Sequence, residues 1–278
     1  MKTVGFIGLG VMGKLMAANL AKKFRVRSYD LNGSGNCRSA REAAEGSDAL
    51  ITMVPAGNDV RDAVLDALPG LKRGAVVIDM SSADPAGTLA LGKVLKANQI
   101  AMVDAPVSGA RFKAKDGTLA IMVGGDKAAV KKVMPVLRTM GTEIFYCGRP
   151  GAGHAVKSLN NYLGAAGTLA GFEALLIAQR FGLDPRPMID AINASTGRNS
   201  TTVRKIPQDI LTGAYASGFK LSLMTKDVGI AAELARGLRV KTPFLKETLK
   251  HWKAAQKMLK RDADHTEIYK YQKKLTRQ

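Results

Sequence analysis

The sequence predicts an α/β protein, with a mostly parallel, doubly wound sheet in its N-terminal half and an all-α domain in its C-terminal half. Short apolar strand patterns alternate with helical patterns over the first half of the chain. A glycine-rich turn directly follows the first strand, and strand patterns stop near residue 153. Because strands that alternate with helices form crossover units, the sheet is expected to be mainly parallel.

The expected strands are short, apolar and bounded by turn residues. A helical pattern at residues 13–23 separates the first two, with Leu15, Met16 and Leu20 at helical spacing. The strands are expected at residues 4–7, 25–29, 49–54, 75–79, 101–104, 119–123 and 143–146.

A long helix is expected at residues 155–181, which are rich in Ala and Leu, lack proline and end before Gly182. The pattern is apolar on nearly all sides, which indicates a buried helix. We therefore expect a sheet domain at residues 1–152 and an all-α domain at residues 153–278.

Length and composition fit a two-domain globular protein of the cytoplasm. The chain has 278 residues, of which 46% are hydrophobic. The first strand begins so close to Met1 that a signal peptide is not expected, and no apolar run is long enough to span a membrane. The two cysteines, Cys37 and Cys147, fit a reducing compartment, and the three histidines show no metal-ligand spacing, so no metal is expected.

The chain is strongly basic, with a formal net charge of +19. Much of the excess follows residue 236, where Lys246, Lys250, Lys253 and Lys257 recur on one helical face. We interpret this set as a solvated basic face, because no zinc-finger or basic-region pattern accompanies it. Recruitment of anionic substrates and weak nucleic-acid binding remain alternatives, and nucleic acid is not the expected partner.

A dinucleotide-binding motif follows the first strand. The sequence Gly8-Leu9-Gly10-Val11-Met12-Gly13 opens the first helix, and Asp30 ends the second strand 22 residues after Gly8. This context is typical of a Rossmann-type domain. Gly8 allows the tight turn, Gly10 lets the pyrophosphate approach the backbone, and Gly13 permits close packing of helix and strand. All six motif residues are expected to bind the cofactor at a helix N-terminus.

Asp30 favours NAD over NADP. A carboxylate at this position accepts hydrogen bonds from the ribose hydroxyls and repels a 2′-phosphate. The next residues are Leu31 and Asn32, so no arginine adjoins the acid. Arg38 lies in the following loop and could return to this position, so use of NADP stays open.

Two further motifs contain candidate substrate-binding and catalytic residues. The first follows the strand at 101–104 and contains Pro106 and Ser108-Gly109. Its hydroxyl and backbone N–H groups could bind a carboxylate, although this segment alone could be an ordinary loop. Lys157 and Asn161 lie four residues apart at the start of the long helix and project from one face. Burial and a positively charged neighbour lower the pKa of a lysine amine, as a general base for alcohol oxidation requires.

Together these motifs resemble the β-hydroxyacid dehydrogenase family, which includes 3-hydroxyisobutyrate dehydrogenases and tartronate semialdehyde reductases. The resemblance extends from the glycine turn through residues 104–125 and 157–161 to Met224-Thr225-Lys226-Asp227, nearly the whole chain. It implies an NAD-binding domain joined by a long interdomain helix to an all-α domain, a small carboxylate substrate, and a homodimer or homotetramer.

The resemblance also assigns roles to single residues. It makes Lys157 the catalytic lysine and Asn161 the amide that helps to hold the substrate. It places Ser108 and Gly109 at the substrate carboxylate. On the cofactor side it implies Met53, Val54 and Pro55 beside the adenosine and Ser82 near the nicotinamide ribose, with Lys226 near both nicotinamide and substrate and Phe219 as an aromatic wall above the substrate.

The chain departs from the family pattern in two places. The family usually has the motif Ser-Gly-Gly-x-x-Gly/Ala-Ala, whereas this chain has Ser108-Gly109-Ala110-Arg111-Phe112-Lys113-Ala114. Ala110 is expected to stiffen the loop, and Arg111 and Lys113 add positive charge that could meet a second anionic or polyhydroxylated substrate end or could point to solvent. Residues 32–39 are shorter than expected after the second strand, which affects adenosine recognition.

The expected function is therefore hydride transfer between NAD(H) and a small 3-hydroxy acid or its semialdehyde, with Lys157 as general acid and base. Four-carbon sugar acids of the threonate type, or 4-hydroxybutyrate and succinic semialdehyde, are alternative substrates. An imine reductase is a further alternative, although Lys157 argues against it. So is a non-catalytic module that binds nucleic acid through the basic face.

Overall fold

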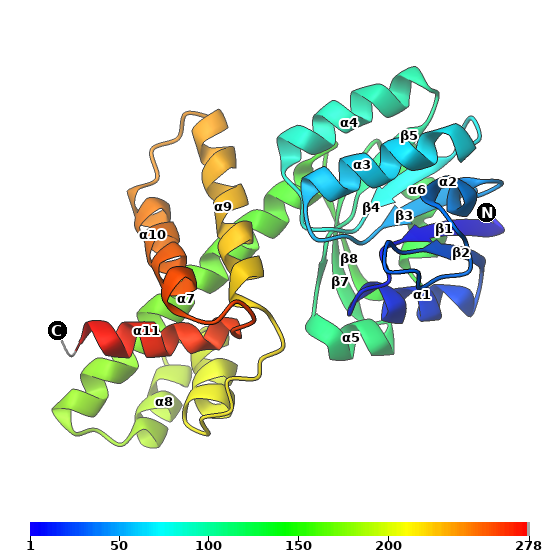
Figure 1. Ribbon diagram of the computed structural model, residues 1–278. Coiled ribbons are helices and arrows are strands. Elements are labelled where there is room, and N and C mark those ends of the chain that lie inside the picture. The colour runs from blue at the N-terminus through cyan, green and yellow to red at the C-terminus, as the bar shows by residue number, and fades with distance from the viewer. Residues whose placement is uncertain (277–278) are drawn as a thin grey trace. The chain divides into compact units, whose positions relative to one another are not determined.

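The chain divides into two compact units, Met1–Lys157 and Ser158–Gln278, and the computed structural model describes residues 1–276. The division falls within the long helix α7, Ala152–Phe181. Strands and helices alternate in the first unit, whereas the second is built from helices (Figure 1).

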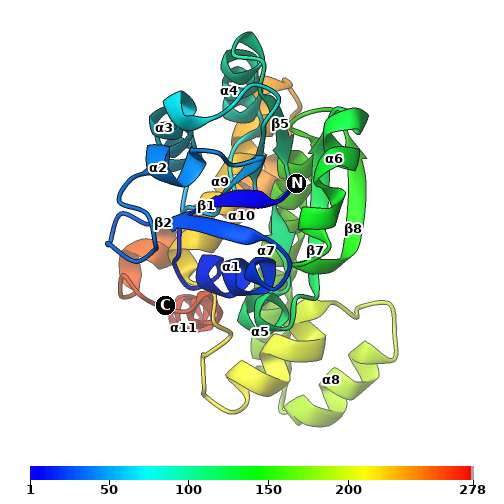
Figure 2. The ribbon, with the colours of Figure 1, turned by 90° about the vertical axis from the view of Figure 1, so that its right-hand side faces the viewer.

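The first unit contains an eight-stranded sheet with the order β2-β1-β3-β4-β5-β7-β6, in which β8 pairs with β7. The five strands from β2 to β5 run parallel, as do β7 and β8. β7 is antiparallel to β5 and β6, and with β8 it lies at the opposite end of the sheet from β2 (Figure 2). The strands are β1 (Thr3–Ile7), β2 (Arg25–Tyr29), β3 (Ala49–Thr52), β4 (Val76–Asp79), β5 (Ala101–Asp104), β6 (Val107–Ser108), β7 (Leu119–Gly125) and β8 (Gly141–Gly148).

Helices cover both faces of this sheet, because successive side chains of a strand point to opposite faces. Phe6 and Ile51 pack with α1, α5 and α6 in one buried cluster. Ile7 and Leu50 pack with α2, α3 and α4 in another. The helices are α1 (Gly13–Ala21), α2 (Ala40–Ala44), α3 (Gly57–Ala67), α4 (Pro85–Ala97), α5 (Ala110–Asp116) and α6 (Lys127–Leu137), with a 3₁₀ turn at Leu68–Gly70.

The predicted α/β class with a mostly parallel sheet is confirmed, and all seven expected strands are present. Two details differ. β3 ends at Thr52, because residues 53–55 turn away into the loop before α3. β6 was not expected, since its two residues had the appearance of a loop, and it exists through pairing with β7 rather than through its own pattern.

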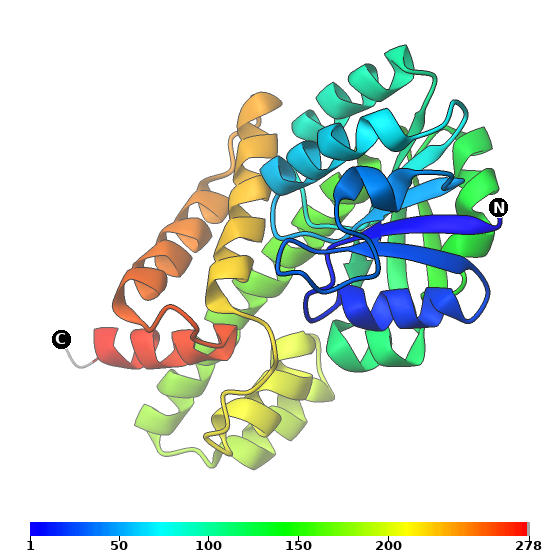
Figure 3. The ribbon, with the colours of Figure 1, turned by 45° about the vertical axis from the view of Figure 1, so that its right-hand side comes forward.

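The second unit is helical, as predicted, and has its own apolar core. Its centre is formed by Phe172, Leu175 and Trp252, all fully buried. α9 (Leu221–Gly237) and α10 (Pro243–Met258) lie side by side (Figure 3). The remaining elements are α8 (Pro185–Asn193), a π-helix at Thr201–Ile210, a 3₁₀ turn at His265–Glu267 and α11 (Ile268–Leu275).

None of the helices within residues 1–276 has the length and apolar character that a bilayer crossing requires.

Candidate active site

The glycine turn after β1 is shaped to hold a dinucleotide. Gly8 has a φ of +97°, and a Cβ added there would lie 2.3 Å from the Met53 carbonyl oxygen. A Cβ on Gly13 would lie 1.9 Å from the Gly8 carbonyl oxygen, so the start of α1 packs directly on the turn. Gly10, in contrast, has nothing within 4 Å of that position. The open surface at Gly10 fits the close backbone approach that a pyrophosphate needs.

Asp30 is held rigidly beside this turn. Its Oδ2 accepts a hydrogen bond of 2.5 Å from the Leu9 N–H, and its Oδ1 accepts one of 3.0 Å from the Asn32 N–H. The side chain is half-buried. The carboxylate is thus fixed where a ribose hydroxyl could donate to it, and the residues present fit NAD.

The short connection after β2 folds back onto that strand. The Asn36 side chain accepts a hydrogen bond of 2.7 Å from the Ser28 N–H and donates one of 3.0 Å to the Val26 carbonyl oxygen. The segment therefore covers the edge of β2 and leaves Asp30 at the carboxyl end of the strand. Arg38 is exposed, and its backbone N–H donates 2.7 Å to Glu42 Oε2.

The loops after β3 and β4 are tied to each other and to the glycine turn. Met53 N–H donates 2.9 Å to the Ile7 carbonyl oxygen. Val54 N–H donates 3.0 Å to Ser81 Oγ. Because these strands are parallel, the residues that follow them, Pro55 and Ser82 included, gather at one edge of the sheet with the glycine turn and Asp30.

The Ser108 turn carries an unusual backbone. Ser108 ends β6 and is half-buried, Gly109 has a φ of +139°, and Ala110 has a φ of +57°. A Cβ on Gly109 would lie 2.6 Å from Lys113 Cδ, so the stem of this lysine runs along the turn. Arg111 is exposed. Lys113, rather than Arg111, is the cation next to the expected carboxylate site.

Lys157 is half-buried on the second turn of α7, as the last residue of the first unit. The first turn of that helix is anchored by buried polar contacts around His154 and Asp104. No feature of the sequence made these two residues stand out as a pair, because they are 50 positions apart.

The second unit holds the other predicted residues. Asn161 is buried, and its Nδ2 donates 2.6 Å to Asp227 Oδ2. Lys226 Nζ lies 3.1 Å from Asp227 Oδ1. Asp227 therefore joins α7 to α9 and orients the Asn161 amide, a role that sequence reasoning did not assign. Phe219 is half-buried, with its ring edge-on to His265 at 5.8 Å between centroids.

Neither cysteine has the character of a nucleophile. Burial raises the pKa of the Cys147 thiol, and likewise that of Cys37, so both favour the unreactive protonated form. Residues 1–276 contain no group of His, Cys, Asp and Glu side chains suited to hold a metal ion.

Comparisons with known protein families cover nearly the whole chain. Residues 3–148 match the NAD binding domain of 6-phosphogluconate dehydrogenase. Residues 151–272 match a family model described as NAD-binding of NADP-dependent 3-hydroxyisobutyrate dehydrogenase.

Individual relatives and a solved structure are also similar to this chain over most of their length. The chain is 38% identical to 2-(hydroxymethyl)glutarate dehydrogenase of Eubacterium barkeri over 87% of its own length and 85% of that protein. It is 34% identical to the NAD-dependent L-serine dehydrogenase of Pseudomonas aeruginosa, covering 88% and 89% of the two chains. Its structure resembles that of Mycobacterium tuberculosis 3-hydroxyisobutyrate dehydrogenase with L-serine, with a TM-score of 0.90, 30% identity and coverage of 98% and 99%.

Proposed function

The chain belongs to the β-hydroxyacid dehydrogenase family, and from this premise we propose that it transfers a hydride between NAD(H) and a small 3-hydroxy acid or its semialdehyde. The observation that carries the proposal is the edge of the sheet at which these residues start. The first turn of α7, which precedes Lys157, is anchored to Asp104 at the carboxyl end of β5. The dinucleotide turn and Asp30, which the Leu9 N–H holds in place, lie at the carboxyl ends of β1 and β2 in the same parallel sheet.

The cofactor site would be formed by the ends of the parallel strands. Gly8, Leu9, Gly10, Val11, Met12 and Gly13 would hold the pyrophosphate, with Asp30 at the adenosine ribose, Met53–Pro55 beside the adenosine and Ser82 nearer the nicotinamide. When bound, NAD supplies the hydride acceptor. Preference for NAD over NADP follows from the carboxylate that Leu9 and Asn32 hold in place.

The substrate would be held and deprotonated by side chains of the chain itself. The hydroxyl of Ser108 and the N–H of Gly109 would bind the carboxylate. Lys157, as a neutral amine, would take the hydroxyl proton while the C–H hydride leaves, and as an ammonium it would return that proton to the carbonyl oxygen in reduction. Asn161, oriented by Asp227, would hold the same oxygen, and Lys226 and Phe219 would complete the site.

The test is an assay of NADH formation with a panel of 3- and 2-hydroxy acids, run with NAD and with NADP. We expect activity on 3-hydroxy acids, and Lys157→Met should lower kcat by roughly 100-fold or more, the usual contribution of a general acid–base group. Lys246→Met, on the exposed basic face, is the matched control and should behave as the wild type. No activity on any hydroxy acid in either direction would contradict the proposal, and activity on imines instead would favour an imine reductase.

A second candidate substrate class has another anionic group at its far end. The specific observation is that Lys113 stands where the family pattern has a small residue, with its stem along Gly109. Side chains on a helix lean toward its N-terminus, which brings the Lys113 ammonium back toward the Ser108 turn. Among the curated relatives, 2-(hydroxymethyl)glutarate dehydrogenase is named for a dicarboxylic acid.

Lys113→Met tests this class, with Arg111→Met as the exposed control. If Lys113 binds a second anion, KM for a dicarboxylic 3-hydroxy acid should rise about 10-fold, the size of a charged hydrogen bond, while KM for 3-hydroxyisobutyrate changes little. An equal rise for both acids would mean that Lys113 serves the shared carboxylate instead. Threonate and 4-hydroxybutyrate belong in the same panel as alternative substrates.

We also propose that the enzyme is a cytoplasmic homodimer or homotetramer. One side of α7 supports self-association, because Leu163, Ile177 and Phe181 are 68%, 70% and 81% exposed. Large apolar side chains that are exposed on one side of a helix are typical of an association surface.

A further inference from the structure

A buried polar cluster surrounds the first turn of α7, three residues before Lys157. His154 is 1% exposed, and Asp79 and Asp104 are 0% exposed. The three residues come from the start of α7 and from the ends of β4 and β5. Burial of ionisable side chains is costly unless each has partners, so the contacts within the cluster indicate its purpose.

Both nitrogens of the His154 ring face polar atoms. Nε2 lies 3.2 Å from the Ser81 carbonyl oxygen and 3.5 Å from Asp79 Oδ2. Because a carbonyl oxygen can only accept a hydrogen bond, Nε2 carries a hydrogen. Nδ1 lies 2.7 Å from the Thr88 hydroxyl on α4. The ring is thereby held by the end of β4, the loop after it and the helix that follows.

Asp104 fixes the backbone of the same turn. Its Oδ1 accepts 2.8 Å from the Gly151 N–H, and its Oδ2 accepts 3.0 Å from the His154 N–H. These are N–H groups that a helix start leaves without intrahelical partners, and a carboxylate is the favoured group to meet them. A Cβ on Gly153 would lie 2.3 Å from the Met122 carbonyl oxygen, so the turn sits directly against β7.

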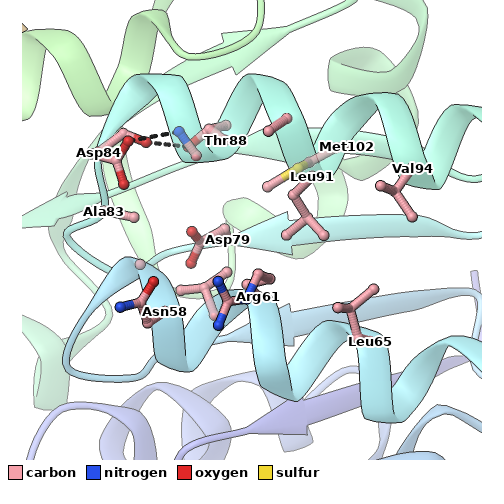
Figure 4. A pocket seen from close by; sticks show the side chains of 14 residues that line it. Asn58, Arg61, Leu65, Asp79, Ala83, Asp84, Thr88, Leu91, Val94 and Met102 are labelled. Atoms are coloured by element: carbon pink, nitrogen blue, oxygen red, sulfur yellow. Dashed lines mark hydrogen bonds between the residues drawn. The ribbon is translucent and has the colours of Figure 1, made fainter.

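The other side of the cluster borders a cavity of about 260 Å³ between α3 and α4. Asp79 and Thr88 line it together with Asn58 and Arg61 (Figure 4). Asp79 Oδ1 accepts 2.9 Å from the Thr52 hydroxyl and 3.0 Å from the Ser81 N–H. His154 therefore connects the start of α7 to the loop after β4. Ser81 in that loop also accepts a hydrogen bond from Val54 in the loop after β3, and both loops are proposed to line the cofactor.

We propose that His154 is a positioning residue for Lys157: it ties the first turn of α7 to β4 and α4, and so sets where the lysine amine lies relative to the cofactor loops. The inference rests on the proposed role of Lys157 as general acid and base. Residues three apart lie on neighbouring parts of one helix face, so a shift of His154 carries Lys157 with it. For proton transfer the amine nitrogen must lie within about 2.6–3.2 Å of the substrate oxygen, and a misplacement of about 1 Å can cost roughly 100-fold in rate.

The first test compares His154→Ala, Thr88→Val and Thr88→Ser. His154→Ala should lower kcat by roughly 100-fold while KM for NAD and for the acid changes by less than about 3-fold. Thr88→Val should lower kcat in the same direction by a smaller factor, and Thr88→Ser, which keeps the hydroxyl, should recover it. His251→Asn, at a histidine of the second unit, should leave kcat unchanged and serves as the control.

The second test follows backbone hydrogen exchange in the same variants. We expect His154→Ala to speed exchange at residues 151–158 and to leave the rest of the first unit as in the wild type. Unchanged exchange there, or a kcat in His154→Ala equal to that of an active wild type, overturns the inference and leaves the proposed function standing. An inactive wild type instead contradicts the proposed function, on which the inference depends.

Discussion

At the scale of single residues, Ala110 combines a substitution in the family motif with a strained backbone. Its φ of +57° lies in the left-handed region, where glycine is favoured over alanine. The family pattern has glycine at this position, next to the turn that is proposed to bind the substrate carboxylate. The strain is consistent with a loop that is held in one conformation by its neighbours.

We predict that Ala110→Gly raises the free energy of unfolding by about 1 kcal/mol, because glycine removes the steric cost of the left-handed conformation. Ala90→Gly, on an exposed position inside α4, is the matched control and should lower the free energy by about 1 kcal/mol. Urea unfolding of both variants checks the prediction. An equal decrease in the free energy of unfolding in both variants would show that the backbone of Ala110 is not strained.

At the same scale, Asp30 is the residue proposed to determine the preference for NAD over NADP. Asp30→Asn keeps an acceptor for the Leu9 N–H but removes the charge. We expect the ratio of kcat/KM for NAD to that for NADP to fall by about 10-fold or more, since a charged hydrogen bond is lost and repulsion of the 2′-phosphate is relieved. Initial-rate measurements that show an unchanged ratio would mean that another residue sets the preference for NAD. Arg38 would then be the first residue to substitute.

At the scale of elements, the sequence was sufficient for strands and helices with a clear period but not for contacts between distant segments. β1, β4 and α7 have strong apolar patterns, and each lies where it was expected to within a few residues. β6 has two residues and exists only because β7 pairs with it. Asp227 and His154 act through partners 66 to 73 positions away, at Asn161 and Ser81, which no local pattern reveals.

The turn around His265 gives the second unit a pH-dependent stability. Burial lowers the pKa of His265 to about 4, helped by the nearby Lys205 ammonium and opposed by Asp264. In the unfolded chain the ring binds a proton near pH 6.5. Between these values the unfolded state holds more protons, so stability is complete above about pH 6.5 and falls as the pH drops toward about 4.

We therefore predict that the free energy of unfolding decreases by about 2–3 kcal/mol over this window through His265. His265→Asn should flatten the decrease, whereas His251→Asn should leave it as in the wild type. Denaturant unfolding at a series of pH values provides the measurement. The same slope in all three proteins would contradict the buried, neutral state of His265.

At the scale of the whole molecule, the apolar side of α7 is expected to control assembly. Ile177→Lys places a charge among exposed apolar side chains and should shift a dimer or tetramer toward the monomer, whereas Gln179→Lys, two residues away and also exposed, should not. Light scattering after size-exclusion chromatography measures the masses. A monomeric wild type would contradict the proposed dimer or tetramer.

The central claim concerns both units: the chain moves a hydride from a small 3-hydroxy acid to NAD with Lys157 as the base. The most direct measurement uses 3-hydroxyisobutyrate deuterated at C3 and follows the label by mass spectrometry of the nicotinamide product. We predict one deuterium in the reduced cofactor from the wild type and a strong loss of rate in Lys157→Met. Label that appears in water, or an undiminished rate in Lys157→Met, would contradict the account.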